Sequence, residues 1–215
     1  MKIYKFRPLR NEDDLCRIKQ ILETGNLWCS PFFDLNDPME GIFRSYEHIV
    51  DEIFSQKCKF KICSFSGKKA FENPIMWGYY ANGFKGVAIE VEVKDGDVKV
   101  IDYQKKISEP ASASEENVRK ILCRKLDVWG HEDEYRFLTK EGSDQLCKIG
   151  KVTKVFLGKP FNHAHNMNSI NGESKNLQKY ENLANELVRF SIEKEIPHSE
   201  VIIDTENNKV KELTI

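Results

Sequence analysis

Residues 73–93, NPIMWGYYANGFKGVAIEVEV, place an aromatic segment directly before an alternating apolar one. PIMWGYYA predicts a short helix, the glycines that follow predict a turn, and GVAIEVEV is typical of a strand. Trp77 and Tyr80 are expected to pack between this helix and a sheet, because large aromatic side chains bury much apolar area. Tyr79 and Asn82 are the better candidates for an exposed role at a pocket. The segment therefore requires a helix packed on a sheet.

The other periodic segments predict further helices and strands. We expect antiparallel hairpins from GVAIEVEV to VKVIDYQ and at the end of the chain, over Asn207 and Asn208. Because strands pair mainly through hairpins and helices are few, the predicted class is α+β, with two small, largely antiparallel sheets and flanking helices. Helices are expected over 11–25, from Phe43 to about 54, over about 118–126 and over about 180–187, and further strands at KIYKFR, NLWCS, KFKICSFS, EYRFLT and KVTKVFLG.

Length and charge limit the possible partners. The 215 residues can form one domain, spanning 1–215. Lys and Arg number 33 against 34 Asp and Glu, a net charge of -1, so bulk charge favours neither nucleic acid nor a membrane surface. The N-terminal sequence MKIYKFRPLR lacks the apolar run of a signal peptide, and no segment reaches the roughly 18 apolar residues of a membrane span. We expect a cytoplasmic protein without a membrane partner.

The six cysteines form no CxxC pair, so the sequence predicts no zinc site and no resident metal. Most are expected to be reduced, half-buried small hydrophobes. Cys29 and Cys63, in WCSP and ICSFS, each end a strand-like run, which could place them near a cleft.

Paired carboxylates occur in the segment HEDEYRF. On a single strand Glu132 and Glu134 would face the same side, with Arg136 next in line. Two carboxylates on one face repel unless a cation or ligand offsets them, and one can acquire the raised pKa that suits acid–base work. Two interpretations stay open: a catalytic pair, or a surface ladder that Arg136 and other basic residues neutralise.

Four segments, in order, resemble the uncharacterised bacterial family catalogued as domain of unknown function 2971. They are YKFRPL, LWCSPFFDLNDPMEG, ICSFSG with NPIMWGYYANGFKGVAIEVEV, and DVWGHEDEYRF with VTKVFLG. The resemblance covers nearly the whole chain, and Tyr79 stands where the family pattern has histidine. Membership of this family implies no activity.

A second resemblance concerns the order of Arg7, then Ser64 and Ser66, then Glu132 and Glu134. This order is similar to the R-S-E arrangement of ADP-ribosyltransferases, whose fold is a pair of small antiparallel sheets with an early helix. The resemblance implies an enzyme that uses NAD, a transferase or an NAD glycohydrolase, with a small-molecule nucleotide as substrate and a macromolecular acceptor. A bacterial toxin or phage-defence effector would fit this activity.

Roles for the single residues follow from the same resemblance. Arg7 would hold the phosphates, Ser64 and Ser66 would support the nicotinamide pocket, and Tyr79 or Tyr80 would stack on a ring. Glu134 would stabilise an oxocarbenium-like ribose, and Glu132 would orient the acceptor.

Two other functions stay open. The chain could be a non-catalytic module that binds a nucleotide or a protein through a pocket at Trp77 and Tyr80. It could also be a metal-dependent phosphodiesterase or nuclease that uses Asp37, Glu40, Glu132, Glu134 and Lys140. The loop SPFFDLNDPMEG offers oxygen ligands, but Asp37 is more simply interpreted as the cap of the following helix. His163 and His165 are expected in an exposed loop.

Overall fold

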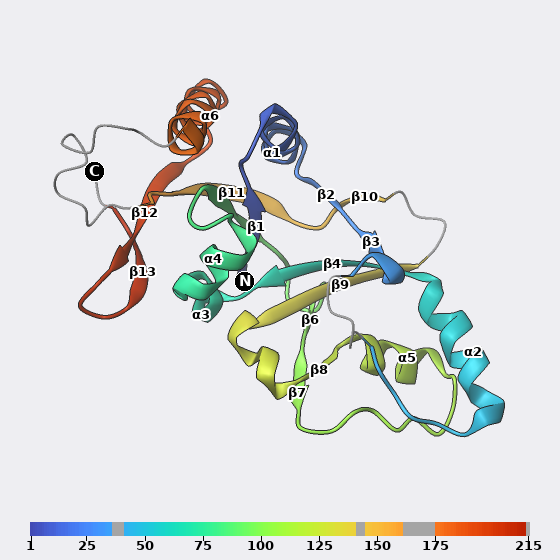
Figure 1. Cartoon of the computed structure of the whole chain (residues 1–215). Helices are drawn as coiled ribbons and strands as arrows, with labels where there is room; N and C mark the ends of the chain where they lie inside the picture. Colours follow the sequence, from blue (N-terminus) through green and yellow to red (C-terminus); the bar gives the residue numbers. More distant parts are fainter. Residues whose placement is uncertain (36–40, 141–144, 161–174, 214–215) are drawn as a thin grey trace.

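In the described residues, nine strands form one curled sheet that runs through the molecule (Figure 1). The computed structural model describes residues 1–35, 41–140, 145–160 and 175–213. The strand order is β13-β12-β11-β5-β1-β4-β9-β6, with β3 paired to β4. These strands are β1 (Lys2–Pro8), β3 (Ser30–Pro31), β4 (Phe60–Ser66), β5 (Gly86–Glu92), β6 (Lys99–Val100), β9 (Glu134–Lys140), β11 (Lys151–Gly158), β12 (His198–Asp204) and β13 (Lys209–Glu212).

Two pairs of short strands lie beside the main sheet. β2 (Asn26–Trp28) pairs with β10 (Leu146–Lys148) in antiparallel fashion, and β7 (Asp102–Gln104) pairs with β8 (Arg124–Leu126) in parallel. Pairing within the main sheet is antiparallel except between β11 and β12. The predicted mixed class with mostly antiparallel strands is therefore confirmed.

The helices lie on both faces of the sheet (Figure 1). α1 and α6 cover one face of the half that contains β1, β5 and β11, and α3 and α4 cover its other face. α2 and α5 pack near β4 and β9. The helical segments are α1 (Glu12–Thr24), η1 (Phe32–Asp34), α2 (Glu47–Cys58), α3 (Lys68–Phe71), α4 (Pro74–Tyr80), α5 (Glu115–Leu122), η2 (Asp127–Glu132) and α6 (Lys175–Glu193).

Local sequence signals fix the ends of α1 and α4. Asn11 Oδ1 accepts a hydrogen bond from the Asp14 amide at 2.9 Å, and Gly25 ends α1 in the left-handed conformation with φ 71°. Asn73 caps α4 through a 3.0 Å hydrogen bond from the Ile75 amide. Both helices were predicted, and both are confirmed.

Three apolar cores correspond to these layers. The first joins α1 and α6 to the sheet, and the third joins α2 and α5 to β4. The second core lies under α3 and α4 and contains an aromatic cluster: Tyr4, Phe6, Phe71, Trp77, Phe84 and Phe156. Trp77 is fully buried and stacks on Phe84 with ring centroids 5.4 Å apart, which confirms the predicted packing role of Trp77.

The predicted pair of small sheets is wrong, because the main sheet is continuous. β1 connects its two halves: it pairs along its whole length with β5 and through Tyr4 and Ser66 with β4. Most neighbouring strands are far apart in the sequence, so pairing is not dominated by hairpins as predicted. The hairpin of β12 and β13 at the end of the chain is confirmed.

The predicted hairpin from GVAIEVEV to VKVIDYQ is also wrong. β5 is buried at every residue from Gly86 to Val91 and lies between β1 and β11, so both of its edges are already paired. The chain that follows instead forms β6, which pairs with β9, and β7, which pairs with β8. Alternation in the sequence identified the strands but not their partners.

The second helix begins later than predicted. α2 starts at Glu47, whereas Phe43 forms an isolated bridge with Ser108. Of the expected apolar face, Ile53 is fully buried, while Tyr46 and Phe54 are exposed. The proposed capping role of Asp37 and the expected loop at His163 and His165 lie outside the described residues.

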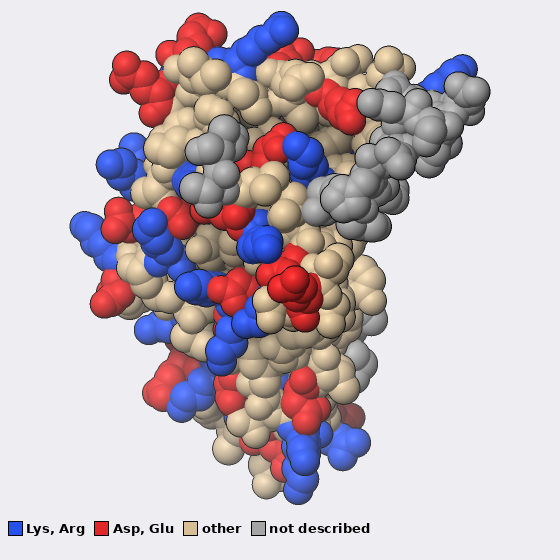
Figure 2. Space-filling view, turned by 90° about the vertical axis from the view of Figure 1, so that its left-hand side faces the viewer, with Lys and Arg blue, Asp and Glu red and all other residues tan. Residues whose placement is uncertain are grey.

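Charge is mixed over the face in Figure 2, where acidic and basic side chains lie interspersed. This distribution agrees with the near-zero net charge of the sequence. No helix within the described ranges is long and apolar enough to cross a membrane.

Candidate functional site

A pocket with a volume of about 490 Å³ lies along β1 and β4. Tyr4 on β1 is the registered partner of Ser66 on β4. Lys5 Nζ on β1 donates a hydrogen bond to the Ser64 carbonyl on β4 at 2.6 Å. The remaining walls come from β9, the end of α4, the segment around β2 and η1, and the segment from β8 to η2. The polar and aromatic lining residues include Lys5, Arg7, Arg10, Trp28, Asp34, Ser64, Ser66, Tyr79, Tyr80, Lys125, Trp129, Glu132, Glu134 and Arg136.

All seven predicted site residues line this pocket. Arg7 lies on β1, the two serines on β4 and Glu134 on β9, and these three strands are neighbours in the sheet. Ser66 is the registered partner of Glu134, and Ser64 is the partner of Arg136. The convergence therefore follows from strand order. The full set is Arg7, Ser64, Ser66, Tyr79, Tyr80, Glu132 and Glu134.

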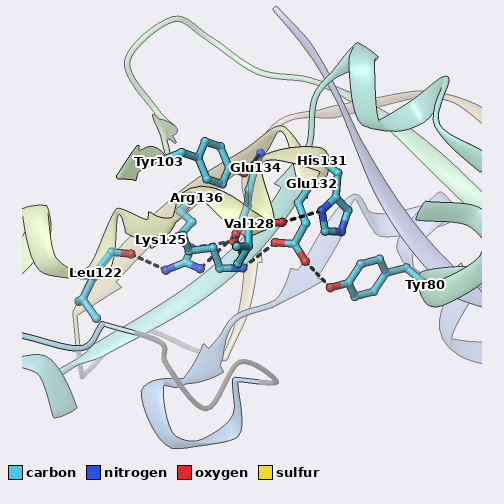
Figure 3. A network of polar contacts seen from close by, with 9 residues as sticks. All are labelled: Tyr80, Tyr103, Leu122, Lys125, Val128, His131, Glu132, Glu134 and Arg136. Carbon is cyan, nitrogen blue, oxygen red and sulfur yellow. Dashed lines mark hydrogen bonds and ion pairs between the residues drawn. The ribbon is translucent and has the colours of Figure 1, made fainter. Parts of the chain in front are cut away.

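A buried charged cluster forms the acidic side of the pocket (Figure 3). It consists of Lys125, Glu132, Glu134 and Arg136, all at most 9% exposed. Lys125 Nζ lies 2.6 Å from Glu132 Oε2 and 2.8 Å from Glu134 Oε2, so one ammonium bridges both carboxylates. Arg136 Nε donates to Glu134 Oε1 at 2.7 Å, and its Nη1 donates to the Leu122 carbonyl.

The two glutamates do not share a strand, which corrects the expected geometry. Glu132 ends η2, Asp133 adopts a left-handed conformation with φ 43°, and Glu134 is the first residue of β9. The carboxylates still meet because both point to Lys125. The surface-ladder interpretation is wrong, because Arg136 neutralises a buried glutamate inside a pocket wall, and the catalytic pair stays a prediction.

Ionisation of Glu134 is set by its partners. Burial raises the pKa of this carboxyl, but the charges of Arg136 and Lys125 outweigh burial and lower the pKa to about 2. The Glu134 amide also donates to the Tyr103 hydroxyl at 2.8 Å, which fixes the start of β9 (Figure 3). Glu134 is therefore a carboxylate at neutral pH. This state suits electrostatic stabilisation of a positive charge and does not suit a general acid.

Two half-buried cations on β1, Lys5 and Arg7, form the opposite side of the pocket. Burial lowers the pKa of both groups, and within the described residues neither has a carboxylate at ion-pair distance. Arg7 Nε is also buried, and it has no hydrogen-bond partner among the described residues. Buried polar groups in proteins are rarely left unpaired, so this donor is suited to an anionic ligand. Arg10, at the rim, is paired instead with Asp14 at 2.8 Å.

The two tyrosines of α4 occupy different environments. Tyr79 is 72% exposed at the pocket, as expected for a side chain with an exposed role. Tyr80 is half-buried, and its hydroxyl donates to Glu132 Oε1, so its predicted role as core packing is only partly correct (Figure 3). Trp28 and Trp129 also line the pocket. Aromatic faces at its mouth can stack on a planar ring.

Sequence reasoning missed Lys5 and Lys125, which supply much of the charge of the site. Lys5 belongs to the alternating segment KIYKFR, where a basic residue is expected to face solvent. In the folded protein it lines the pocket instead. Lys125 comes from the three-residue strand β8, and no local pattern marks it. Its distance from the carboxylates is a product of the tertiary fold.

Of the residues proposed for metal-dependent chemistry, Glu132 and Glu134 line the pocket, whereas Lys140 pairs with Glu115 outside the pocket lining. Asp37 and Glu40 lie outside the described residues. Within the described ranges, no group of three or more His, Cys, Asp or Glu side chains could hold a metal ion.

No protein-family model, curated protein or solved structure matches this chain. The pocket combines half-buried cations on one side, a neutralised carboxylate pair on the other and aromatic rings at its mouth. Such a site can hold an anionic ligand with a planar ring and a hydroxyl-bearing part.

Proposed function

We propose that this pocket binds NAD and that the protein cleaves the nicotinamide–ribose bond, as an ADP-ribosyltransferase or NAD glycohydrolase does. One observation carries the proposal: Arg7, Ser64 with Ser66, and Glu134 lie on three neighbouring strands and line one pocket. The order of these residues resembles the R-S-E arrangement. An ADP-ribosyltransferase-like fold is part of the proposal, and the early helix α1 after β1 is consistent with it.

The cationic side would bind the pyrophosphate. Arg7 and Lys5 are half-buried cations without a carboxylate partner in the described residues, so a phosphate group would offset the cost of their partial burial. The unpaired Arg7 Nε supplies a hydrogen-bond donor for a phosphate oxygen. Tyr79, exposed at the mouth, would stack on a base.

The acidic side would bind the nicotinamide ribose. As the C–N bond breaks, its electron pair leaves with neutral nicotinamide, and positive charge develops on the ribose. Water or an acceptor hydroxyl then adds to the same carbon and releases a proton. The Glu134 carboxylate, ionised at neutral pH, would stabilise that charge, and Glu132 would orient the acceptor.

The cations of the charged cluster favour one alternative, a nucleotide-binding module without catalysis. Lys125 and Arg136 already neutralise the two carboxylates. A carboxylate held in this way stabilises a developing positive charge less than an unpaired one does, because its field is partly cancelled. Under this alternative the cluster is a scaffold for the pocket, and a bound nucleotide is not consumed.

Two measurements on the wild-type protein distinguish these functions. The first is the release of nicotinamide from NAD over hours, with and without bacterial extract as acceptor. The second is the shift in melting temperature with NAD and with ADP-ribose. Turnover with stabilisation supports the enzyme, and stabilisation without turnover supports the module. If neither NAD nor ADP-ribose changes the melting temperature and no nicotinamide is released, the proposal is wrong.

Variants then assign the two sides of the pocket. Arg7→Met should remove most of the thermal shift produced by NAD, whereas Arg189→Met, an exposed arginine on α6, should not change that shift. Glu134→Asp keeps the charge and Glu134→Gln removes it. Turnover should fall at least about 100-fold in Glu134→Gln and less in Glu134→Asp. Equal turnover in wild type and Glu134→Gln would remove Glu134 from the catalytic role.

A further inference from the structure

Three cysteines, Cys29, Cys63 and Cys147, lie in or beside β2, β3, β4 and β10, which lie together in Figure 1, and Cys63 is close to Lys5 and Arg7. Cys147 on β10 is the registered partner of Leu27. Cys29 Sγ donates to the Leu27 carbonyl at 4.0 Å, and its thiol lies close to those of Cys63 and Cys147. Cys29 and Cys63 are both buried in the core beneath α1, and each is at most 1% exposed. The proposed NAD function makes no use of these groups.

The strand register places Cys29 opposite Cys63. β3 pairs with β4 through Ser30 with Ile62 and Pro31 with Lys61, so one more step in the same antiparallel register brings the two cysteines together. Residues directly opposite in antiparallel strands have Cα atoms about 4.5–5.5 Å apart. A disulfide requires Cα atoms about 4.4–6.8 Å apart. If this register continues to Cys29, the two Cα atoms have the spacing that a disulfide requires.

The surroundings of Cys63 favour its thiolate. The neighbouring Cys29 thiol, followed by the charges of Lys5 and Arg7, outweighs burial and lowers the pKa of Cys63. Proximity to Cys63 and burial raise the pKa of Cys29. The two positive charges beside Cys63 therefore favour its thiolate over that of Cys29.

We propose that Cys29 and Cys63 are an oxidation site that forms an intramolecular disulfide on exposure to a peroxide. The Cys63 thiolate attacks one peroxide oxygen, the O–O bond breaks, and Cys63 becomes a sulfenic acid. The Cys29 sulfur then attacks the Cys63 sulfur and displaces hydroxide, which takes up the Cys29 proton as water. Overall, two thiols are oxidised by two electrons and one hydrogen peroxide is reduced to two waters.

Formation of this bond has a consequence for the pocket. Lys5 and Arg7 both line the pocket and both lie close to Cys63, so the proposal requires that a peroxide, which is close to water in size, pass from the pocket to the buried thiolate. The disulfide removes the negative charge beside the two cations. It also ties the segment that contains Trp28, a pocket residue, to β4.

The wild-type protein allows a direct test. Trypsin releases Cys29 in the peptide 20–44 and Cys63 in the peptide 62–68, and each contains a single cysteine. The reduced protein is treated with about one equivalent of hydrogen peroxide, its remaining thiols are alkylated, and the digest is analysed by mass spectrometry. We expect the 20–44 and 62–68 peptides to be linked, the loss of two of the six thiols, and full recovery with dithiothreitol. The exposed Cys16 should remain alkylated as a free thiol.

Variants identify the order of the steps. Cys29→Ser leaves Cys63 without a resolving thiol, so dimedone should label the 62–68 peptide after peroxide treatment. Cys58→Ser is the matched control and should retain the crosslink of wild type. The proposal is overturned if the dominant link joins Cys29 to Cys147, if Cys16 is oxidised before Cys63, or if all six thiols survive one equivalent of peroxide.

Discussion

The aromatic cluster under α3 and α4 and the charged cluster beside β9 are buried to a similar degree, but different forces hold them. Trp77 in the first is fully buried among rings, and its indole Nε1 donates to the Phe71 carbonyl at 2.8 Å. Glu134 in the second is 4% exposed and is held by Arg136 and Lys125. Apolar packing is insensitive to pH, whereas ion pairs require both partners to be charged. Only the charged cluster can respond to pH or to a charged ligand.

Truncation of the aromatic cluster should have the largest effect. Trp77→Ala removes a fully buried indole and leaves a cavity, so we expect the free energy of unfolding to fall by about 3–5 kcal/mol. The loss should be the same at pH 7 and pH 4. Urea denaturation at both pH values measures it, with Ile75→Ala, an exposed position on the same helix, as control. A near-native free energy of unfolding in Trp77→Ala would contradict the stabilisation of the fold by this aromatic cluster.

Removal of one charge from the charged cluster should lower the free energy of unfolding somewhat less than Trp77→Ala does, and this loss should depend on pH. Glu134→Gln leaves Lys125 and Arg136 with one carboxylate fewer. The lowered pKa of Glu134 corresponds to a contribution of about 3 kcal/mol to the free energy of unfolding at neutral pH. Because the folded-state pKa of about 2 lies below the ordinary value of 4.5, this stabilisation is complete above about pH 4.5 and is lost as pH falls towards 2.

The difference in unfolding free energy between wild type and Glu134→Gln isolates this group from other acidic residues. Urea titrations at pH 7, 5 and 3 should give a constant difference down to pH 5 and about half of it at pH 3. The exposed Glu116→Gln, whose side chain is 77% exposed, serves as control. A difference that does not change between pH 7 and pH 3 would contradict the ionised, paired state of Glu134.

A smaller loss is expected at the border between the two clusters. Tyr80→Phe removes the hydrogen bond that the phenol donates to Glu132, and hydrogen bonds to charged groups contribute about 1.5–3 kcal/mol. Partial exposure of Tyr80 places the expected loss at the lower end of that range. Thermal unfolding measures it, and Tyr135→Phe on β9 is a comparison in which the phenol lies outside the pocket lining. An unchanged melting temperature would mean that Tyr80 does not connect α4 to the charged cluster.

The smallest effect on stability is expected at the pocket mouth. Tyr79 is 72% exposed, so Tyr79→Ala should change the unfolding free energy by no more than about 0.5 kcal/mol. If the NAD proposal holds, the same variant should lower the affinity for NAD several-fold in calorimetry, because a stacking surface is lost. The adjacent exposed Ile75→Ala should leave affinity unchanged. Equal affinities in the two variants would exclude stacking by Tyr79.

Local signals predicted much of the fold because they act over a few residues. Asn11 and Gly25 set the ends of α1, and the alternation of KFKICSFS identified β4. Strand partners were predicted poorly, since alternation is the same whichever strand lies alongside. The sequence of β5 is typical of one arm of a hairpin, yet β5 is a central strand between β1 and β11, buried from Gly86 to Val91.

The sequence predicted which residues form the site, but not how the fold brings them together. The order of Arg7, Ser64 with Ser66, and Glu134 pointed to residues that do share a pocket, since β1, β4 and β9 are neighbours. The expected strand geometry of Glu132 and Glu134 was wrong, because the left-handed Asp133 separates a 3-10 helix from the strand. No local pattern marked Lys125.

The sequence by itself determined which segments become helix or strand, which aromatic residues are buried, and which polar residues are candidates for the site, because propensity, periodicity and capping are local properties. Only the tertiary structure decided that Lys125 bridges two glutamates, that Lys5 and Arg7 face a pocket, and that Cys29 lies against Cys63. Ionisation, burial and contact between distant residues depend on the surroundings that the whole chain creates, and charges in particular are set by neighbours within a few ångströms.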